Sequence, residues 1–333
     1  MTTIKDVAKC AGVSVGTVSK VINNISVKPN TKLAVEEAIK KLNYEPNEYA
    51  RGLKVNRTNT VALIIPTVWH PFFSELAYNV EKNLKKLNLK MILCNSEDNY
   101  CNELEYITMA KQNKVDGIIA LTYSDLNKYI SSNLPVISID RYFSNEITSV
   151  SSDNFNGGKI AAQELKKAGC KNLVFVGSGS KIDNSTRQRE KGFKKYCEEN
   201  NIFYESYYII HENDYELNKK YGFKQFIKEF IKNNYSNNKI VFDGIFAVTD
   251  KHANIILNEL NKLNIKVPED VQIVGFDGCK SSSEAEIKIS TIRQPVELIA
   301  SEAVKSVIDL LENKPIEKEI IVPVYFIKGY TTK

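Results

Sequence analysis

From residue 60 onward, short apolar segments alternate with amphipathic segments of helical length. The apolar segments are nearly continuous, as in TVALIIP at 60–66 and VQIVGFDG at 271–278. Continuous apolar strands are typical of parallel sheets that helices cover on both faces. The number of strand–helix units exceeds what one compact sheet usually holds. This part of the chain is therefore predicted to be an α/β body with two lobes, each built on a doubly wound parallel sheet.

The first residues of the chain follow a helical pattern instead. A first helix is predicted by apolar residues at i, i+3, i+4 and i+7, namely Ile4, Val7, Ala8 and Ala11. Gly12 is suited to end this helix, and Ser14 can cap a second one. A third amphipathic helix is predicted over residues 31–42. Two helices joined by a glycine-bearing turn have the spacing of a helix-turn-helix, whose second helix enters the major groove of DNA. A plain helical hairpin with a basic surface is the alternative.

The excess positive charge of the chain lies entirely in this N-terminal region. Residues 1–57 hold ten Lys or Arg and five Asp or Glu, whereas the remaining residues hold 35 of each kind. A local excess of basic residues is what phosphate contacts require. A solvated basic face is the alternative, but the helix spacing favours nucleic acid.

Composition limits the other classes of protein. Apolar residues make up 43% and charged residues 26%, as in an ordinary globular chain. Neither a membrane-spanning apolar run nor an N-terminal signal segment is visible, so we expect a cytoplasmic protein. The six cysteines form no CxxC pair, so we expect reduced thiols and no metal site.

Polar residues follow several of the predicted strands. Open α/β sheets bind ligands at the carboxyl ends of their strands. The residues at these ends are Asn95 to Asp98, Tyr123, Asp140 with Arg141, Gly177 to Ser180, Thr249 with Asp250, and Asp277. Carboxylates, arginines and aromatic rings suit a sugar, and Trp69, Phe72 or Phe73 could stack on a sugar ring. For each aromatic residue, core packing is the alternative.

The sequence contains no recognisable catalytic or cofactor motif. GSGSKI at 177–182 lacks the third glycine of a dinucleotide fingerprint, and GxxxxGK[ST] and HExxH are absent. An enzyme is therefore not expected, nor is a cofactor. A secreted sugar-binding protein would share the body but would have no need of the basic head.

Four segments of the chain resemble the lactose-repressor (LacI/GalR) family of bacterial transcription regulators. They are TIKDVAKCAGVS, TVSKVIN, NYEPN and ARGLKVNRT. The resemblance implies a helix-turn-helix head at 1–46, a hinge helix and linker at 47–60, and a periplasmic-binding-protein-like body at 61–333. It further implies that the body divides into an N-lobe at about 61–161 and 292–321 and a C-lobe at about 162–289 and 323–333.

The resemblance also implies which residues meet DNA. Val15, Gly16 and Lys20 occupy recognition-helix positions that select the operator, with Val15 suited to a thymine methyl and Lys20 to guanine. Contact with phosphates, or stabilisation of the helix itself, is expected of Thr17, Ser19 and Asn23. The remaining DNA-binding residues expected in the head are Thr3 and Ser14. In the hinge, Leu53 matches a leucine that wedges into the minor groove, with Asn47, Ala50 and Lys54 beside it. A flexible linker is the alternative reading of the hinge.

Effector contacts are implied in the same way. Arg189, in RQREKGF, and Asp277, in IVGFDG, match residues that bind effector hydroxyls or carboxylates. The other implied contacts are Phe72, Asp140, Arg141, Ser185, Phe246 and Asp250. Helix capping or surface ion pairing is the alternative for the charged residues, above all for Asp250.

The function implied is that of a homodimeric repressor on a pseudo-palindromic operator. An effector between the lobes, expected to be a sugar or sugar derivative, would change the lobe angle and the spacing of the hinges. No leucine heptad follows the last strand, so a dimer is expected rather than a tetramer. A nucleobase or phosphoprotein effector stays open. A cytosolic sugar sensor that acts through a protein partner is the alternative function.

Overall fold

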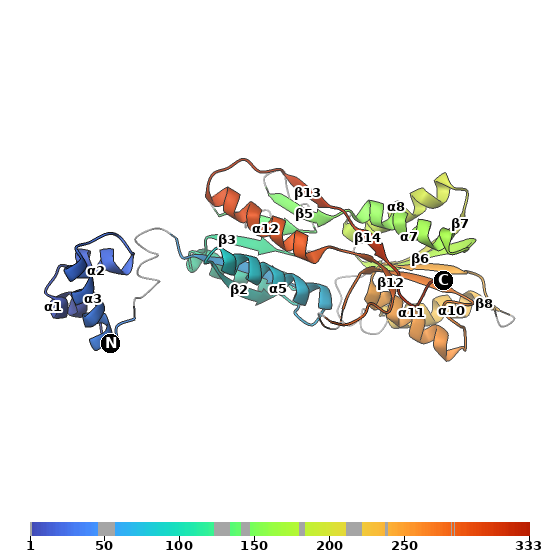
Figure 1. Ribbon diagram of the computed structural model, residues 1–333. Helices are drawn as coiled ribbons and strands as arrows, with labels where there is room; N and C mark the ends of the chain where they lie inside the picture. Colours follow the sequence, from blue (N-terminus) through green and yellow to red (C-terminus); the bar gives the residue numbers. More distant parts are fainter. Residues whose placement is uncertain are drawn as a thin grey trace. The chain divides into compact units, whose positions relative to one another are not determined.

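The computed structural model describes residues 2–45, 57–122, 134–140, 147–179, 184–210, 222–236, 239–280, 282 and 284–333. The chain forms two compact units, Met1–Thr58 and Asn59–Lys333 (Figure 1). None of the helices in these described ranges combines the length and the apolar character needed to cross a membrane.

Three helices make up the first unit: α1 (Ile4–Ala11), α2 (Val15–Ile22) and α3 (Pro29–Lys41). All three predicted helices are confirmed, although α3 begins earlier than expected, because Pro29 has a φ suited to the first helical turn. Gly12 ends α1 in the left-handed conformation, with φ of 64°. The helices share one small core, whose buried members are Val7, Ala8, Val18, Val21, Val35 and Ala38.

The second unit contains two six-stranded sheets. The first sheet has the order β13-β5-β4-β3-β1-β2, and its paired strands are all parallel. Its strands are β1 (Thr60–Ile65), β2 (Lys90–Asn95), β3 (Gly117–Ala120), β4 (Val136–Ile139), β5 (Thr148–Ser152) and β13 (Glu319–Val322).

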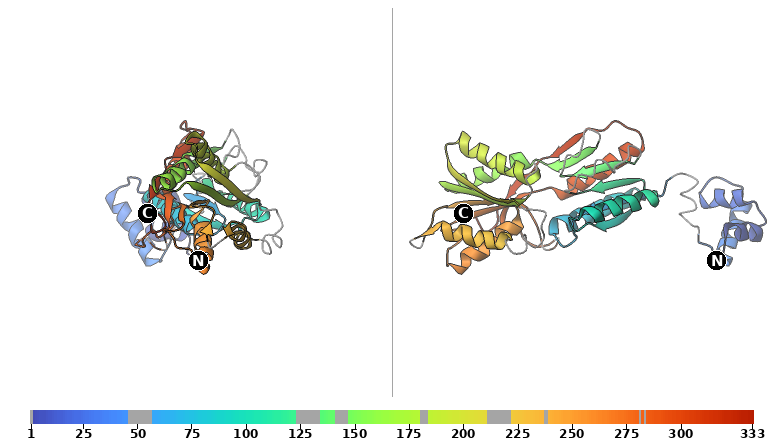
Figure 2. Two further views of the ribbon diagram at one scale, coloured as in Figure 1. Left: turned by 90° about the vertical axis from the view of Figure 1, so that its right-hand side faces the viewer. Right: turned by 180° about the vertical axis from the view of Figure 1, so that it is seen from behind.

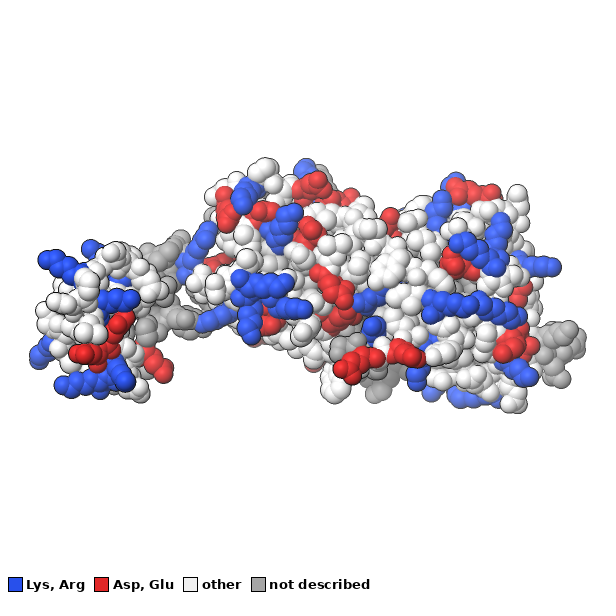
Figure 3. Space-filling model, in the orientation of Figure 1, with Lys and Arg blue, Asp and Glu red and all other residues white. Residues whose placement is uncertain are grey.

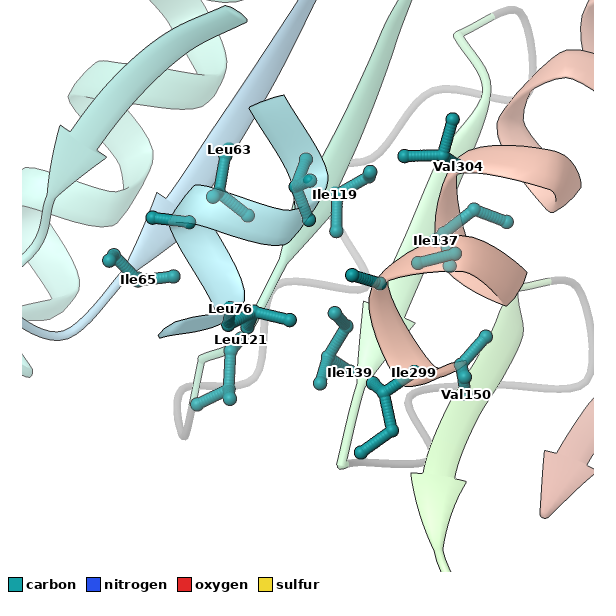
Figure 4. Close-up of a cluster of buried hydrophobic side chains, with 14 of the residues drawn as sticks. Leu63, Ile65, Leu76, Ile119, Leu121, Ile137, Ile139, Val150, Ile299 and Val304 are labelled. Carbon is teal, nitrogen blue, oxygen red and sulfur yellow. The ribbon is translucent and has the colours of Figure 1, made fainter. Parts of the chain in front are cut away.

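Helices cover both faces of the first sheet. On one face, α5 (Pro71–Lys86) and α12 (Val296–Leu311) bury Leu63, Ile119 and Ile137 (Figure 4). On the other face, α6 (Tyr100–Gln112) packs with the alternate strand residues, including Ala62 and Ile64. Because successive strand residues point to opposite faces, a sheet buried on both sides needs the continuous apolar runs seen in the sequence.

The second sheet has the order β14-β12-β11-β10-β6-β7. Its strands are β6 (Asn172–Gly179), β7 (Phe203–Ile210), β10 (Gly244–Ala247), β11 (Gln272–Asp277), β12 (Ser290–Arg293) and β14 (Tyr325–Ile327). Only β14 runs antiparallel to its neighbour, β12. One face carries α7 (Asn154–Lys167) and α8 (Ser185–Glu199), and the other carries α10 (Phe223–Asn233) and α11 (Asp250–Lys262). A small antiparallel pair, β8 (Tyr235–Ser236) and β9 (Lys239–Ile240), lies outside both sheets.

The chain passes between the two sheets three times: between β5 and α7, between β12 and α12, and between β13 and β14 (Figure 2). The lobe limits expected at residues 161 and 292 fall inside α7 and β12. Helix α7 packs on the second sheet, and β12 pairs with β11 and β14. The first two crossings thus come before α7 and after β12. Each helix or strand belongs to one layer, because its apolar face or its backbone hydrogen bonds are satisfied there.

Candidate functional site

The exposed surface of α2 carries the residues that were expected to read DNA bases. Val15 is 37% exposed, and Gly16 and Lys20 are also exposed. The opposite side of the helix buries Val18 and Val21 in the core of the first unit. The visible face of this unit shows lysine or arginine side chains at several points of its rim (Figure 3). The helix therefore presents one apolar and one cationic side chain to a partner.

Thr3 and Ser14 are exposed residues at the starts of the two helices. The Thr3 amide and hydroxyl donate to the Asp6 carboxylate at 2.8 and 2.7 Å. These hydrogen bonds hold the pKa of Asp6 below its usual value. Ser14 Oγ accepts from the Thr17 amide at 3.1 Å and lies 3.0 Å from the Thr17 hydroxyl. Both residues thus define helix ends while staying accessible.

Ser19 and Asn23 are connected at the other end of α2. The Asn23 side-chain amide donates to the Ser19 carbonyl at 2.8 Å and to the Ser19 hydroxyl at 3.3 Å. These contacts support the helix-frame interpretation of the two residues. Asn47, Ala50, Leu53 and Lys54, expected in the hinge, and Arg141, expected at the effector site, lie outside the described residues.

A pocket of about 300 Å³ lies between the two lobes of the second unit. Two expected effector residues line it: Asp140, after β4 in the first sheet, and Ser185, the first residue of α8 on the second sheet. Its other lining residues are Ser149, Ser151, Ser152, Asp153, Asn154, Phe155, Asn184, Gln188, Glu319 and Ile321. We refer to this set of residues as the inter-lobe pocket.

Arg189 lies next to this pocket and is only 3% exposed. Its Nε donates to Asn154 Oδ1 at 2.8 Å, and its Nη1 donates to the Val248 carbonyl at 2.8 Å. Nη1 is also 3.6 Å from Asp277 Oδ1. The guanidinium lies over the Phe276 ring, 3.6 Å from its centre. The side chain is thus held rigidly, as binding a small polar ligand requires.

The network continues from Arg189 into both lobes. The Asn154 amide donates to Asp140 Oδ1 at 3.2 Å, and Gln294 Nε2 donates to Asp277 Oδ1 at 2.7 Å. Burial raises the pKa values of Asp140 and Asp277, and the positive charge of Arg189 opposes this rise. Three of the expected residues, Asp140, Arg189 and Asp277, are therefore brought into one network.

Asn154 and Gln294 were not anticipated as members of this network. Gln294 directly follows β12. Ligand residues tend to lie at strand ends, so Gln294 would have been predicted if residues 290–293 had been recognised as a strand. No comparable signal marks Asn154, which takes its place only because the chain crosses between the sheets just before it.

His70 and Asp98, from the first lobe, face the charges of the second. Burial, Lys251 and Arg189 lower the pKa of His70, in that order of importance. Burial and Glu103 raise the pKa of Asp98, while Lys251 lowers it. The buried Nδ1 of His70 has no hydrogen-bond partner among the described residues. His70 was not among the expected residues, although it directly precedes α5 and follows β1.

Two aromatic residues differ from the expectation that they contact an effector. Phe246 is completely buried, with its ring against those of Phe175, Phe193 and Phe276, so it serves the core and offers no surface to a ligand. Phe72 is also buried, in the core of the first lobe. Trp69 is almost fully exposed but lines a separate pocket of about 730 Å³.

Asp250 holds the loop after β11 instead of facing the inter-lobe pocket. Its Oδ1 accepts from the Thr291 hydroxyl at 2.6 Å, and its Oδ2 accepts from the Cys279 amide at 2.7 Å. Thr249, not Asp250, caps α11. Asp250 is buried, and both of its carboxylate oxygens accept hydrogen bonds. Its acidic side chain is therefore explained by these structural contacts, without a ligand.

A close crossing of α7 and α8 positions Arg189. A Cβ atom on Gly158 would lie 2.0 Å from the Arg189 carbonyl, and one on Gly192 would lie 1.8 Å from the Phe155 carbonyl. The two backbones approach this closely only because both residues lack a side chain. The glycine three residues after Arg189 therefore sets the depth of the arginine beside the pocket.

Comparison with known proteins agrees with this architecture. The model of the "Bacterial regulatory proteins, lacI family" matches residues 3–47, and that of a "Periplasmic binding protein-like domain" matches residues 162–332. The chain is 35% identical over 332 residues to the sucrose operon repressor of Pediococcus pentosaceus, covering 98% of both chains.

Two solved structures extend the comparison. The periplasmic binding protein/LacI transcriptional regulator from Alkaliphilus metalliredigens QYMF, complexed with D-xylulofuranose, has a TM-score of 0.70 at 26% identity, covering 83% of this chain and 99% of its own. The lac repressor dimer bound to operator and the anti-inducer ONPF shares the fold, with a TM-score of 0.82 at 22% identity over 99% of both chains. The chain belongs to the lacI family of bacterial regulatory proteins, which are DNA-binding transcription repressors and not enzymes.

Proposed function

We propose that this protein represses transcription in the cytoplasm by binding a pseudo-palindromic operator as a homodimer, and that a sugar in the inter-lobe pocket controls its operator affinity. The observation that carries the proposal is the network from Asp140 through Asn154 and Arg189 to Asp277. This network joins residues of both lobes beside one pocket. A ligand bound there contacts both lobes and so favours one lobe arrangement over another.

The chemistry of the network suits a sugar. Rigid carboxylates and a guanidinium form directed hydrogen bonds with hydroxyl groups, and the pocket volume lies at the lower end of the range for small-molecule sites. The names of the similar proteins support the same class: one relative represses a sucrose operon, and one similar regulator was solved with D-xylulofuranose. The proposed contacts with the effector are Arg189, Asp277, Asp140 and Ser185. Arg141 remains a proposed contact on the basis of the sequence alone.

For DNA, we assign base contacts to Val15, Gly16 and Lys20. Their exposure on one side of α2 supports this assignment. Thr3, Ser14, Thr17, Ser19 and Asn23 would hold the helix frame or contact phosphates. The domain division that we propose keeps the head at 1–46, the hinge at 47–60 and the body at 61–333.

Residues 47–60 provide the proposed link between effector and operator. Leu53 would wedge into the minor groove, with Asn47, Ala50 and Lys54 beside it. Leu53→Ala should then weaken operator binding severely while the affinity for the effector is unchanged. Loss of both properties would contradict the wedge assignment or reveal a folding defect, which thermal unfolding of the variant would detect.

A two-stage experiment tests the function. The full-length protein is first used to select its operator from random duplexes, and sugars are screened by thermal shift. A ligand present at 100 times its Kd should add ~2.7 kcal/mol to the stability. Fluorescence anisotropy with the selected duplex should then show that the same sugar changes operator affinity by roughly 5- to 150-fold, the usual range of allosteric coupling.

Each negative outcome has a definite meaning. If a sugar stabilises the protein but no sequence-specific duplex is selected, the protein is a sugar sensor that acts on a protein partner and not a repressor. If an operator is selected but no sugar stabilises the protein, the repressor function holds and a carbohydrate effector is rejected.

A further inference from the structure

The inter-lobe pocket is lined by acidic and neutral polar groups. Asp140, Asp153 and Glu319 contribute three carboxylates, and no Lys, Arg or His is among its lining residues within the described parts of the chain. Serine hydroxyls and the side-chain amides of Asn154, Asn184 and Gln188 make up most of the remainder. Hydroxyls and amides both donate and accept hydrogen bonds, so they match a ligand that carries many hydroxyl groups.

Two cations of the described residues that lie near the junction of the lobes, Arg189 and Lys251, already have anionic neighbours. Arg189 donates to Asn154 and to the Val248 carbonyl, and it lies 3.6 Å from Asp277. Lys251 is exposed and interacts with the charge of Asp98. A ligand with its own negative charge would therefore compete with these carboxylates for each cation.

His70 is a neutral group of the first lobe that lies near the cations Lys251 and Arg189 of the second lobe. Its Nδ1 is buried without a hydrogen-bond partner among the described residues. Because burial and two nearby cations lower its pKa, the imidazole is uncharged at neutral pH. His70 therefore supplies no positive charge that would compensate an anionic ligand.

We infer that the effector of this site is an uncharged sugar, and that sugar phosphates and sugar acids are rejected. The inference rests on the proposed function and specifies its ligand. A phosphate or carboxylate that enters the pocket loses its hydration and meets three carboxylates, and the nearby cations of the described residues, Arg189 and Lys251, already have anionic neighbours. A neutral sugar loses only the hydration of its hydroxyls, which the serine and amide groups replace.

Isothermal titration of the full-length protein with matched pairs tests the inference. Suitable pairs are ribose and ribose 5-phosphate, fructose and fructose 6-phosphate, sucrose and sucrose 6-phosphate, and glucose and gluconate. In the pair that contains the effector or its closest analogue, the neutral member should bind at least ~10-fold more tightly, equivalent to about 1.4 kcal/mol.

The outcomes separate this inference from the function on which it rests. Equal or tighter binding of a charged member would overturn the uncharged effector but keep a carbohydrate-controlled repressor. Failure of all members of all pairs to bind would count against the carbohydrate effector itself, and the inference would fall with it.

A charge variant at the edge of the pocket tests the cause of the selectivity. Glu319→Gln should raise the affinity for the charged member relative to its neutral partner by at least about twofold, because it removes one repulsive charge. Glu317→Gln is the matched control, since Glu317 is exposed, lies on the same segment and does not line the pocket. An unchanged ratio in Glu319→Gln, or an equal change in Glu317→Gln, would show that the charge of the pocket does not set the selectivity.

Discussion

Arg293 and Glu75 join the two lobes through a bidentate ion pair. Arg293 belongs to β12 of the second sheet, and Glu75 belongs to α5 on the first sheet. Arg293 Nη1 donates to Glu75 Oε2 at 3.0 Å and to the Gly278 carbonyl at 3.0 Å, while Nη2 donates to Glu75 Oε1. The arginine is buried, so its charge depends on this partner.

Glu75→Gln should therefore lower the free energy of unfolding by about 2 kcal/mol, as expected when a buried charged donor loses its partner. Glu297→Gln is the control, because Glu297 lies 3.5 Å from the same arginine but is 64% exposed and should contribute less than about 1 kcal/mol. Urea unfolding at neutral pH measures both variants. A loss in Glu297→Gln as large as that in Glu75→Gln would contradict the inter-lobe assignment.

Arg189→Lys should weaken binding of the effector by at least ~10-fold, or about 1.4 kcal/mol. Lysine cannot reproduce the planar fork that reaches Asn154 and Val248 at once. Titration with the sugar found in the thermal-shift screen measures the effect. Arg187→Lys on the same helix is the matched control, because Arg187 pairs with Glu190 and stacks on Tyr208. Equal weakening in both variants would indicate a general disturbance of α8.

Gly192→Ala should destabilise the protein by about 1–3 kcal/mol, the usual range for overpacking. The added methyl group would lie 1.8 Å from the Phe155 carbonyl, so α8 has to move away from α7. Alanine favours helices by roughly 1 kcal/mol over glycine, but the backbone clash is expected to dominate. Lys195→Ala, at an exposed position on α8, serves as the control in thermal unfolding. Unchanged or increased stability of Gly192→Ala would show that the crossing can relax without loss.

Lys20→Ala should relax the preference for one base pair of the selected operator by ~1–3 kcal/mol. The lysine is exposed on α2, where it could reach a guanine edge. Anisotropy with the operator and its single-base variants measures the change. Lys32→Ala is the control, because Lys32 lies on α3 beside Glu36. Uniform weakening on every operator variant would instead identify Lys20 as a phosphate contact.

His70 should make the stability of the protein depend on pH. Its folded-state pKa lies below the ordinary value of about 6.5, so the unfolded chain binds more protons near and below that pH. The contribution of His70 to the free energy of unfolding is therefore fully present above about pH 6.5. It is lost as the pH falls toward the lower folded-state pKa.

The fall in Tm from about pH 7.5 to about pH 5.5 should accordingly be larger in the wild type than in His70→Asn, because the variant lacks this titration. Groups common to both proteins cancel in the comparison. A pH dependence as large in the variant would show that protonation of His70 does not affect folding.

The candidate site was only partly predictable from the sequence. Positions at strand ends led to Asp140 and Asp277, because parallel strands bring their carboxyl ends to one edge of a sheet. The family resemblance implies Phe246 as an effector contact, but this residue lies within a strand and its ring packs in the aromatic core. Asp250 also follows a strand, but its two oxygens are used by Thr291 and Cys279. Position along the chain does not reveal which way a side chain points.

The sequence by itself determined the three helices of the head and the two largely parallel sheets, because these follow from local periodicity, caps and apolar runs. Only the tertiary structure decided that α7 joins the second sheet, that Asn154 connects Asp140 to Arg189, and that Arg293 reaches Glu75. Glu75 and Arg293 are far apart in the chain, and no local pattern records such a pairing. It arises when crossing segments and packed helices bring distant side chains together, and the energy of each contact depends on that shared environment.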